Sequence, residues 1–396
     1  MAETVVVTGR IVNAEDYPAV KVFIIDWDRE QGRIHRMDYS EVVGVGVFGF
    51  FVKESENLYV MAWSDTNGND RFDRGEPAWI SHDETGALAP IVVVPDRPDV
   101  LASLSEAFRY PEELVAPAEA FYRGRHRSEA RSGWEIPLAL GEVAQVSEDR
   151  FSSAGASAGY WEPAGYAMSA GLGIYFTEPY DPGRVPVLFV HGAAGSPHDF
   201  ASMMQKFDRG RFQLWFFHYP SGRRLAEMGG GLDHGLQILR AHYGFEKVHL
   251  VAHSMGGLVS RYAILENQKA EDPCVGRFVS ISSPFGGQEF AAKGVRHAPS
   301  VVPSWRDIEP GSVFLTQLFD ERFSREIDHL MLYGDRSEER LGLPDENDGT
   351  VSVASMTHRP AVREAERLQC FHDDHMAILS NPVVIREVEE FLRAAD

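Results

Sequence analysis

The sequence predicts an α/β fold with a mostly parallel sheet and helices on both of its faces, preceded by an all-β, sandwich-like domain. Two observations support this prediction. From Val185 onward, apolar strands alternate with helical segments, which is typical of a parallel sheet. Before residue 96, short runs rich in Val, Ile and aromatic residues are separated by turn residues, which is typical of an antiparallel sandwich.

A chain of 396 residues with 44% hydrophobic content favours two domains, each large enough to bury a core. We expect a β domain at 1–95, a connecting segment at 96–134 and an α/β domain at 135–396. The strands of the β domain are expected in TVVVTGRIV, VKVFIID, GVGVFGFFV and LYVMAW. Possible helical turns are expected around 101–108 and 119–131, both within the connecting segment.

In the α/β domain, apolar runs mark the expected strands of the parallel sheet. They are VPVLFVHG, FQLWFFHY, VHLVAHS, FVSISSP, HLMLYGD and RLQCFHD. Two earlier strands, in IPLALGEVAQV and GLGIYFTEPY, are expected to form a hairpin, with the small-residue tract SSAGASAG as a loop between them. Ligands of parallel sheets bind at the carboxyl ends of the strands, so the loops after these runs are the place to search for a site.

The formal net charge is −21, with 59 acidic against 38 basic side chains. This excess of negative charge argues against binding to phosphate backbones, so we expect no nucleic-acid partner. The longest apolar run, 42–52, is interrupted by three glycines and is far shorter than the ~20 residues of a spanning helix. We therefore expect no integral membrane segment.

The first ten residues, MAETVVVTGR, contain no basic segment followed by an apolar core, so we expect no secretory signal in this sequence. Cytoplasmic location and export after removal of a signal both stay open. The two cysteines, Cys274 and Cys370, lack the spacing of a disulfide scaffold or a metal site. Because Cys274 is expected before one parallel strand and Cys370 near the far end of another, we interpret both as buried free thiols.

The stretch from Asp65 to Glu76, DTNGNDRFDRGE, places oxygen-bearing side chains at the first, third, fifth, ninth and twelfth positions, as a calcium loop does. Its sixth position is Asp70, where a calcium loop needs glycine, and the segment before it has the pattern of a strand. We therefore favour a polar loop between strands, rich in turn-forming residues, as the interpretation of this stretch. We expect no cofactor and no metal, and calcium binding by this loop is left open.

Ser254 occupies a turn between an apolar strand and a helix in KVHLVAHSMGGLVSRYA. Such a tight turn forces its central residue into a strained conformation, so the residues two positions away must be small. Ala252 and Gly256 meet this requirement, and AHSMG departs from GxSxG by one methyl group. The Ser254 hydroxyl is expected above the N-terminus of the helix, where backbone N–H groups stabilise an oxyanion. Ser254 is the predicted nucleophile.

A serine nucleophile needs a base and a carboxylate that orients the base, in the chain order Ser, Asp or Glu, His. For the acid we favour Asp348 in NDGTV, where a glycine permits a tight turn, over Asp335, which directly follows a strand. For the base we favour His375, which is followed by an amphipathic helix at about 381–395, over His372. Both preferred residues follow the carboxyl ends of predicted strands.

An oxyanion hole requires two N–H donors, one from the residue after the nucleophile and one from a separate loop. Met255 supplies the first. The second is expected from Ala193 in the turn VHGAAG, residues 190–195. We expect His191 to brace this loop and to take no part in proton transfer.

Together these stretches resemble the α/β-hydrolase superfamily, in its lipase and esterase branch. VPVLFVHGAAG resembles the oxyanion-loop strand, AHSMGG the nucleophile elbow of small bacterial lipases, NDGTV the acid turn and DHMAILSNPVVIREVEEFL the histidine loop with the closing helix. The resemblance covers 185–396, about half of the chain, with the four motifs in the family's order. The N-terminal β domain lies outside it.

The resemblance implies a serine hydrolase that acts on acyl esters or lipids. Ser254 is then expected to attack the ester carbonyl, His375 to relay the proton and Asp348 to orient the imidazole, through an acyl-enzyme. SSPFGG, residues 282–287, is similar to the strand end before the lid of such lipases. This similarity implies a helical cap at about 288–325, for which an ordinary pair of peripheral helices is the alternative.

Two kinds of alternative function stay open: other enzymes that use the same catalytic triad, and a protein without catalytic activity. A thioesterase or an acyltransferase has the same triad, and a non-catalytic scaffold could use the β domain to bind a glycan, a lipid head group or another protein. The sequence has no HExxH motif and no phosphate-binding glycine loop, which argues against a metalloenzyme or a nucleotide enzyme. The oligomeric state, acyl length and head group stay open.

Overall fold

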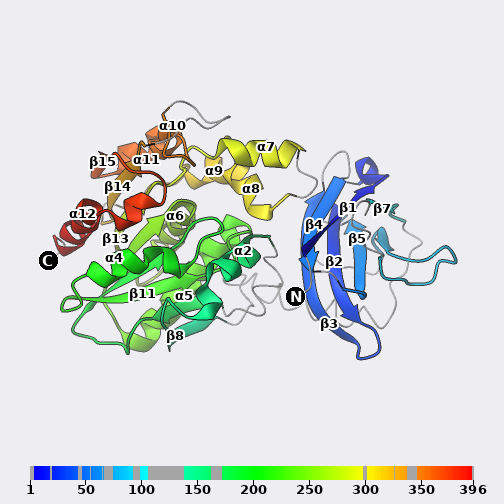
Figure 1. Ribbon diagram of the computed structural model, residues 1–396, viewed down its shortest axis with the longest axis horizontal. Helices are drawn as coiled ribbons and strands as arrows, with labels where there is room; N and C mark the ends of the chain where they lie inside the picture. The colour runs from blue at the N-terminus through cyan, green and yellow to red at the C-terminus, as the bar shows by residue number, and fades with distance from the viewer. Residues whose placement is uncertain are drawn as a thin grey trace. The chain divides into compact units, whose positions relative to one another are not determined.

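The computed structural model describes residues 4–394 except for 18–19, 43–46, 54, 65, 67–74, 92–98, 106–137, 162–171, 298–300, 325 and 337–345 (Figure 1). The chain divides into two compact units. The first consists of Met1–Glu135, Trp161–Met168 and His297–Pro303, and the second of Ile136–Tyr160, Ser169–Arg296 and Ser304–Asp396. Most of the predicted connecting segment, from residue 106 onward, lies outside the described residues.

The first unit contains two β-sheets. The strands are β1 (Thr4–Ile11), β2 (Val20–Asp28), β3 (Arg33–Val42), β4 (Val47–Lys53), β5 (Leu58–Ser64), β6 (Ala78–Ile80) and β7 (Asp99–Ala102). One sheet has the order β4-β1-β7 and the other β3-β2-β5-β6. All of their pairings are antiparallel except β1 with β7. The four strands predicted in this region correspond to β1, β2, β4 and β5, whereas β3, β6 and β7 were not predicted. β7 also lies where the helical turn at 101–108 was expected to begin.

Strand β2 is buried on both of its faces. Val20, Val22 and Ile24 belong to a core shared with residues of β1 and β4. Phe23, Ile25 and Trp27 alternate with them and pack into an aromatic cluster with residues of β5. Because both faces are covered, apolar residues occupy consecutive positions from Val22 to Ile25 of β2 and do not alternate with polar residues there.

The second unit is built on an eight-stranded sheet of order β15-β14-β13-β12-β10-β11-β9-β8. Its strands are β8 (Ala139–Val143), β9 (Gly173–Phe176), β10 (Val185–Val190), β11 (Phe212–His218), β12 (Val248–His253), β13 (Val275–Ile281), β14 (Asp328–Gly334) and β15 (Arg367–Phe371). The strands from β10 to β15 are parallel, as the apolar runs predicted. The sheet is therefore mostly parallel, with β9 antiparallel to β11 at one end.

The predicted hairpin before this sheet is wrong. Strand β8 pairs with β9 in the parallel direction, so the chain must cross over between them. Part of this crossover is the helix α2 (Ser153–Trp161), which contains most of the tract SSAGASAG that was expected to be a loop. A parallel pair cannot be joined by a tight turn, and the alternation of apolar residues did not reveal the direction of pairing.

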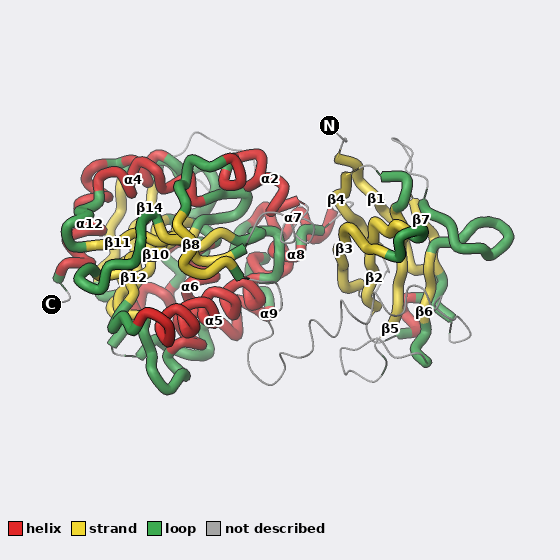
Figure 2. The backbone as a smooth tube through the Cα atoms, turned by 90° about the horizontal axis from the view of Figure 1, so that it is seen from below, coloured by secondary structure: helices red, strands yellow, loops and turns green. Residues whose placement is uncertain are grey.

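Helices cover both faces of the sheet (Figure 2). α4 (Ala201–Lys206) and α12 (Pro382–Arg393) lie on one face, and α5 (Leu225–Tyr243) and α6 (Gly256–Asn267) pack together on the other. On the first face, Val187 and Phe189 of β10 share a core with Val384 and Val388 of α12. α12 begins where Asn381 accepts a hydrogen bond from the Val383 N–H, close to the predicted helix start.

Three short helices occupy the stretch predicted to form a cap. They are α7 (Glu289–His297), α8 (Pro303–Ile308) and α9 (Val313–Leu318), between β13 and β14. The Arg261 side chain of α6 donates hydrogen bonds to the backbone oxygens of Leu318 and Glu321. Asp307 of α8 accepts a hydrogen bond from the Leu225 N–H at the start of α5. The insertion is thus tied to both helices of that face.

Both cysteines are free thiols, but only one is buried. Burial raises the pKa of Cys274 to about 11, so this thiol is inert near neutral pH. The prediction that Cys370 is buried is wrong. Cys370 lies on β15, the edge strand of the sheet, and the edge leaves it exposed.

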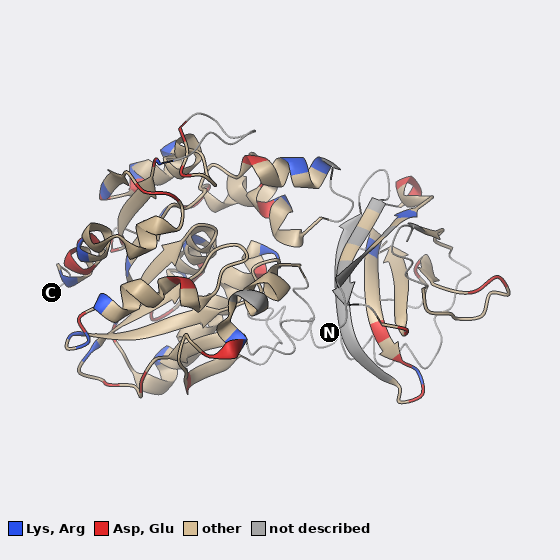
Figure 3. Ribbon diagram, viewed as in Figure 1, with Lys and Arg blue, Asp and Glu red and all other residues tan. Residues whose placement is uncertain are grey.

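Basic and acidic residues are interspersed on the same elements of the second unit, as on α7 and α12 (Figure 3). α12, for example, carries Arg386 and Arg393 next to Glu387, Glu389 and Glu390. Of the helices that the structure describes, none combines the length and the apolar character needed to cross a bilayer.

Candidate active site

Ser254 lies on the predicted strand-to-helix turn, between the end of β12 and the start of α6. Its φ angle is 53°, in the left-handed region that non-glycine residues rarely adopt. A Cβ atom on Gly256 would lie 2.4 Å from the backbone oxygens of both His191 and Val190, so only glycine fits this close approach to β10. The glycine two positions after Ser254 is therefore required by packing against the neighbouring strand.

Asp348 and His375 are brought together by the loops that follow β14 and β15. His375 Nδ1 lies 2.6 Å from Asp348 Oδ2, and the His375 N–H donates to the Asp348 backbone oxygen at 2.8 Å. Because a carboxylate only accepts, Nδ1 carries the proton and Nε2 is left as the free basic nitrogen. The His375 imidazole is thereby fixed in the tautomer that a general base needs.

The Asp348 carboxylate is fully buried, at 0% exposure, yet well supplied with donors. Its Oδ1 accepts hydrogen bonds from the Thr350 and Val351 N–H groups at 3.0 and 2.8 Å. Burial alone would raise the pKa of this carboxyl. The hydrogen bond and charge of His375, together with the two backbone N–H groups, outweigh burial and lower the pKa of Asp348 below its usual value.

The two rival residues pair with each other at the surface. His372 Nδ1 lies 3.0 Å from Asp335 Oδ1, and the His372 side chain is 82% exposed. Because this pair is exposed to water, its contact contributes little to the stability of the fold. The structure thus separates the four candidates into a buried pair, Asp348 with His375, and an exposed pair.

Ser254 and His375 are linked through His253, the last residue of β12. His253 Nε2 lies 2.8 Å from the His375 backbone oxygen, and the two imidazole rings are 4.6 Å apart. Ser254 is 8% exposed, and within the described part of the chain its hydroxyl has no hydrogen-bond partner, His375 included. Catalytic hydrogen bonds of this kind often tighten only when substrate binds.

The predicted oxyanion loop is a tight turn against Ser254. The Gly195 N–H donates to the Gly192 oxygen at 3.2 Å, and Ala194 at the third position of the turn has a φ of 50°. A Cβ atom on Gly192 would lie 2.7 Å from Ser254 Cβ. Among the described residues, the N–H groups of Ala193 and Met255 have no hydrogen-bond acceptor, so both are available to a ligand.

Residues 222–394, which include the turn at Ser254, Asp348 and His375, match the model of a protein family described as alpha/beta hydrolase of unknown function (DUF915). This description agrees with the order of the sheet and with the strained serine between β12 and α6. The second unit has the α/β-hydrolase fold. The fold expected from the four sequence motifs is confirmed.

Solved structures similar to this hydrolase domain include lipases and esterases. The Bacillus licheniformis lipase BlEst2 in its mature form is 19% identical, with a TM-score of 0.47, over 55% of this chain and 97% of the lipase. The lin2722 product of Listeria innocua is 18% identical, with a TM-score of 0.40, over 53% and 94%. A putative aryl esterase from Burkholderia cenocepacia is 16% identical, with a TM-score of 0.37, over 54% and 92%. No curated protein matches the chain. At these identities and scores, the similarities do not specify a substrate.

His191 of the hydrolase domain makes the contacts of a bracing residue. Its ring stacks on Tyr219 with the centroids 4.3 Å apart, and its Nδ1 lies 3.0 Å from the Gly192 oxygen. Burial lowers the pKa of His191 to about 4, so the ring is neutral near pH 7. These contacts hold the His191 ring between Tyr219 and the start of the predicted oxyanion loop.

Three residues near the site were not predicted from the sequence. The Tyr219 hydroxyl donates to the His191 backbone oxygen at 2.6 Å, and Ser221 Oγ accepts from the Ala194 N–H at 3.0 Å. His253, described above, is the third. Tyr219 and Ser221 directly follow β11, so the rule that sites form at the carboxyl ends of strands could have found them.

The stretch from Asp65 to Glu76, in the first unit, lies mostly outside the described residues. Of its candidate ligands, the described Glu76 is buried, and its carboxylate accepts a hydrogen bond from the Thr66 N–H at 2.9 Å. In the described residues no group of three or more His, Cys, Asp or Glu side chains is placed to hold a metal.

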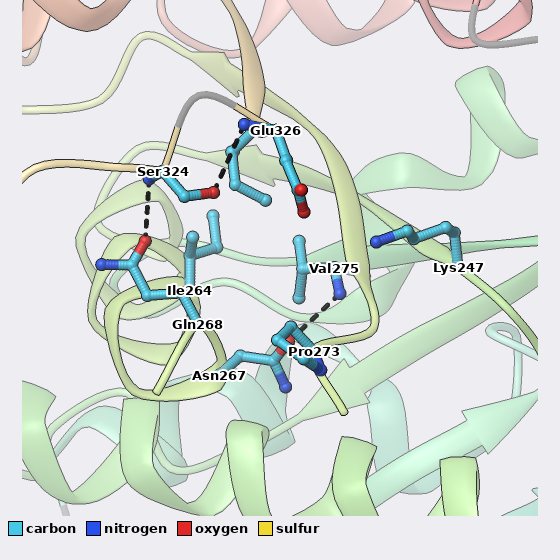
Figure 4. A pocket seen from close by; sticks show the side chains of 9 residues that line it. Lys247, Ile264, Asn267, Gln268, Pro273, Val275, Ser324 and Glu326 are labelled. Carbon is cyan, nitrogen blue, oxygen red and sulfur yellow. Dashed lines mark hydrogen bonds between the residues drawn. The ribbon is translucent and has the colours of Figure 1, made fainter. Parts of the chain in front are cut away.

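A pocket of about 350 Å³ opens at the other end of the sheet of the hydrolase domain (Figure 4). Lys247, Val275 and Ile327 line it at the starts of β12, β13 and β14, opposite to the ends where Ser254 and His375 lie. Its amide side chains are already bonded within the protein, for example Gln268 Oε1 to the Ser324 N–H at 3.0 Å. The pocket takes no part in the candidate active site.

Proposed function

We propose that the hydrolase domain is a serine carboxylic-ester hydrolase that cleaves acyl esters through an acyl-enzyme. One observation carries the proposal. A buried carboxylate holds the His375 imidazole in the basic tautomer. Ser254 has a strained, positive φ angle, and the preceding residue, His253, is hydrogen-bonded to His375. A merely structural histidine needs neither the fixed tautomer nor a strained serine nearby.

The groups present are sufficient for both halves of the reaction. Ser254 Oγ attacks the acyl carbonyl and gives its proton to His375 Nε2, and the N–H groups of Ala193 and Met255 stabilise the oxyanion that forms. Collapse of this intermediate breaks the ester bond, and His375 protonates the departing alcohol. Water then gives a proton to His375 as it attacks the acyl-enzyme. Collapse of the second intermediate breaks the acyl–Oγ bond and releases the acid, and His375 returns the proton to Ser254 Oγ.

Hydrolysis of p-nitrophenyl esters of graded chain length tests the proposal. We expect turnover by the intact protein and a loss of at least about 10³-fold in kcat for Ser254→Ala. Ser260→Ala is the matched control, because Ser260 on α6 is also buried and its hydroxyl has no partner among the described residues. Absence of ester hydrolysis, or equal activity of Ser254→Ala, overturns the proposal.

The same assay separates the alternatives. Acyl-CoA thioesters cleaved faster than the matched oxygen esters indicate a thioesterase, and acyl transfer to an added alcohol at the expense of hydrolysis indicates an acyltransferase. Turnover of long acyl chains indicates a lipase, and activity restricted to short chains an esterase. A scaffold protein turns over none of these substrates. Parallel reactions with EDTA and with added calcium test the loop at 65–76.

A further inference from the structure

His253, the residue directly before Ser254, is a buried histidine that the reaction scheme does not use. It is the last residue of β12 and is 2% exposed. Its Nε2 lies 2.8 Å from the His375 backbone oxygen, 122 residues away along the chain. Because a carbonyl oxygen only accepts, Nε2 must carry the proton and donate.

His375 is held by hydrogen bonds from two directions. Asp348 supplies two of them, one to the backbone N–H and one to Nδ1. These two bonds fix the imidazole relative to the loop after β14, but they do not fix it relative to Ser254. Within the described residues, the bond from His253 is the hydrogen bond that joins His375 to the strand carrying the nucleophile.

The order of the sheet shows why this bond matters. Strand β15, which leads into the His375 loop, is separated from β12 by β13 and β14, so no backbone ladder joins the two. His253 and Ser254 are consecutive, with Cα atoms about 3.8 Å apart. A donor on His253 therefore places the His375 backbone directly with respect to the nucleophile. The contact of the two imidazole rings, 4.6 Å between centroids, restricts sideways movement of His375 as well.

We infer that His253 is a positioning residue, whose Nε2–H holds the His375 backbone so that the His375 imidazole can take the Ser254 proton. This inference rests on the proposed function and adds to it the residue that sets the distance between nucleophile and base. Burial lowers the pKa of His253 to about 3, so near pH 7 the ring is neutral and carries a single N–H.

The alternative is that His253 only fills space in the core. His253→Phe keeps an aromatic ring and removes the donor, whereas His253→Gln can present an amide N–H toward the same oxygen. His249→Phe is the matched control. His249 lies on the same strand, is 4% exposed and makes one ring hydrogen bond, accepting from the Arg277 N–H at 3.0 Å.

The first readout is kcat per active site, with sites counted by the burst of p-nitrophenol. We expect His253→Phe to lower kcat per site by about 10-fold or more with KM unchanged, because small misplacements of catalytic groups are costly. His253→Gln should recover most of this loss, and His249→Phe should stay within about 2-fold of the intact protein. If His253→Phe lowers only the melting temperature and keeps kcat per site, the inference is overturned.

The second readout does not depend on any substrate. The Nδ1 proton of His375, bonded to Asp348, is expected as a low-field proton resonance, and in His253→Phe it should broaden through faster exchange with water. An equally sharp resonance in both proteins overturns the inference, even where no ester is turned over and the proposed function itself has failed. If His253→Phe does not fold, His253→Asn replaces it, because its side chain is too short to reach the His375 oxygen.

Discussion

His375 and Asp348 are joined by a 2.6 Å hydrogen bond between Nδ1 and Oδ2, while the neighbouring pair of the same chemistry, His372 and Asp335, lies at the surface with a 3.0 Å contact. Both pairs join the loop after β14 to the loop after β15, but the pair of Asp348 and His375 is buried and the pair of Asp335 and His372 is exposed. An aspartate that orients a catalytic histidine must be both close and desolvated, and the pair formed by Asp348 and His375 meets both requirements.

Replacing Asp348 by asparagine is expected to lower kcat by about 10³- to 10⁴-fold, because an amide N–H facing Nδ1 favours the wrong tautomer of His375. KM should change little, since Asp348 is buried and does not meet the substrate. Steady-state kinetics on the best p-nitrophenyl ester measures both constants. Asp335→Asn is the control and should keep kcat within about 2-fold. A larger loss for Asp335→Asn than for Asp348→Asn would assign the acid to the rival residue.

Replacing Gly256 by alanine is expected to destabilise the fold by about 1–3 kcal/mol and to abolish ester hydrolysis. The new Cβ atom would lie 2.4 Å from two backbone oxygens of β10 and its following residue, so the turn must shift. Gly230→Ala, in the interior of α5 with no atom within 4 Å of a new Cβ, should instead stabilise by about 0.5–1 kcal/mol. Urea unfolding measures both changes, and equal stability of Gly256→Ala and the intact protein would contradict the packing argument.

Replacing Tyr219 by phenylalanine is expected to lower kcat by about 10-fold without a large change in KM. The lost hydroxyl holds the His191 backbone oxygen at 2.6 Å, and this oxygen borders both the oxyanion loop and Gly256. Tyr262→Phe is the control, because the Tyr262 hydroxyl has no hydrogen bond to a described residue and its ring stacks on Phe314 of α9, with the centroids 6.2 Å apart. An unchanged kcat in Tyr219→Phe would mean that packing alone holds the loop.

The hydrolase domain is expected to lose stability as the pH falls from 7 to 5. Burial lowers the pKa of five histidines from 6.5 to about 3 or 4, and they are His191, His218, His249, His253 and His329. The unfolded chain binds protons at these sites near pH 6.5, whereas the folded chain does not. The stability they contribute is therefore fully present above about pH 6.5 and is lost as the pH falls toward 4, at about 2 kcal/mol for each histidine by pH 5.

The carboxyl of Asp233 has the opposite effect on the pH dependence of stability. Burial raises its pKa to about 6, so its contribution is present below the unfolded pKa and is lost as the pH rises through 6. Burial also raises the pKa of Asp199 and of Asp307, but the five histidines outnumber these three carboxyls, so the net change on acidification is a loss. Melting temperatures recorded by circular dichroism at pH 8, 7, 6 and 5 test this expectation. A constant melting temperature over this range would show that these histidines bind protons within the fold.

The sequence alone was sufficient to locate the parallel sheet and the turn at Ser254. Long apolar runs, small residues at fixed positions and the helix after His375 are local properties, so the pattern of neighbouring residues specifies them. The same locality explains why Cys370 was misplaced and why β8 and β9 were taken for a hairpin. Exposure at a sheet edge and the direction of strand pairing are decided by contacts between segments far apart in the chain.

Only the tertiary structure decided which side chains meet. Asp348 and His375 are brought together because β14 and β15 are adjacent parallel strands whose following loops emerge on the same side. The bonds from Tyr219 to the His191 oxygen and from His253 to the His375 oxygen join backbone groups that carry no sequence signal, since every residue offers the same carbonyl. A short pattern can mark the nucleophile, but the partners of a backbone oxygen depend on how the whole sheet and its loops are packed.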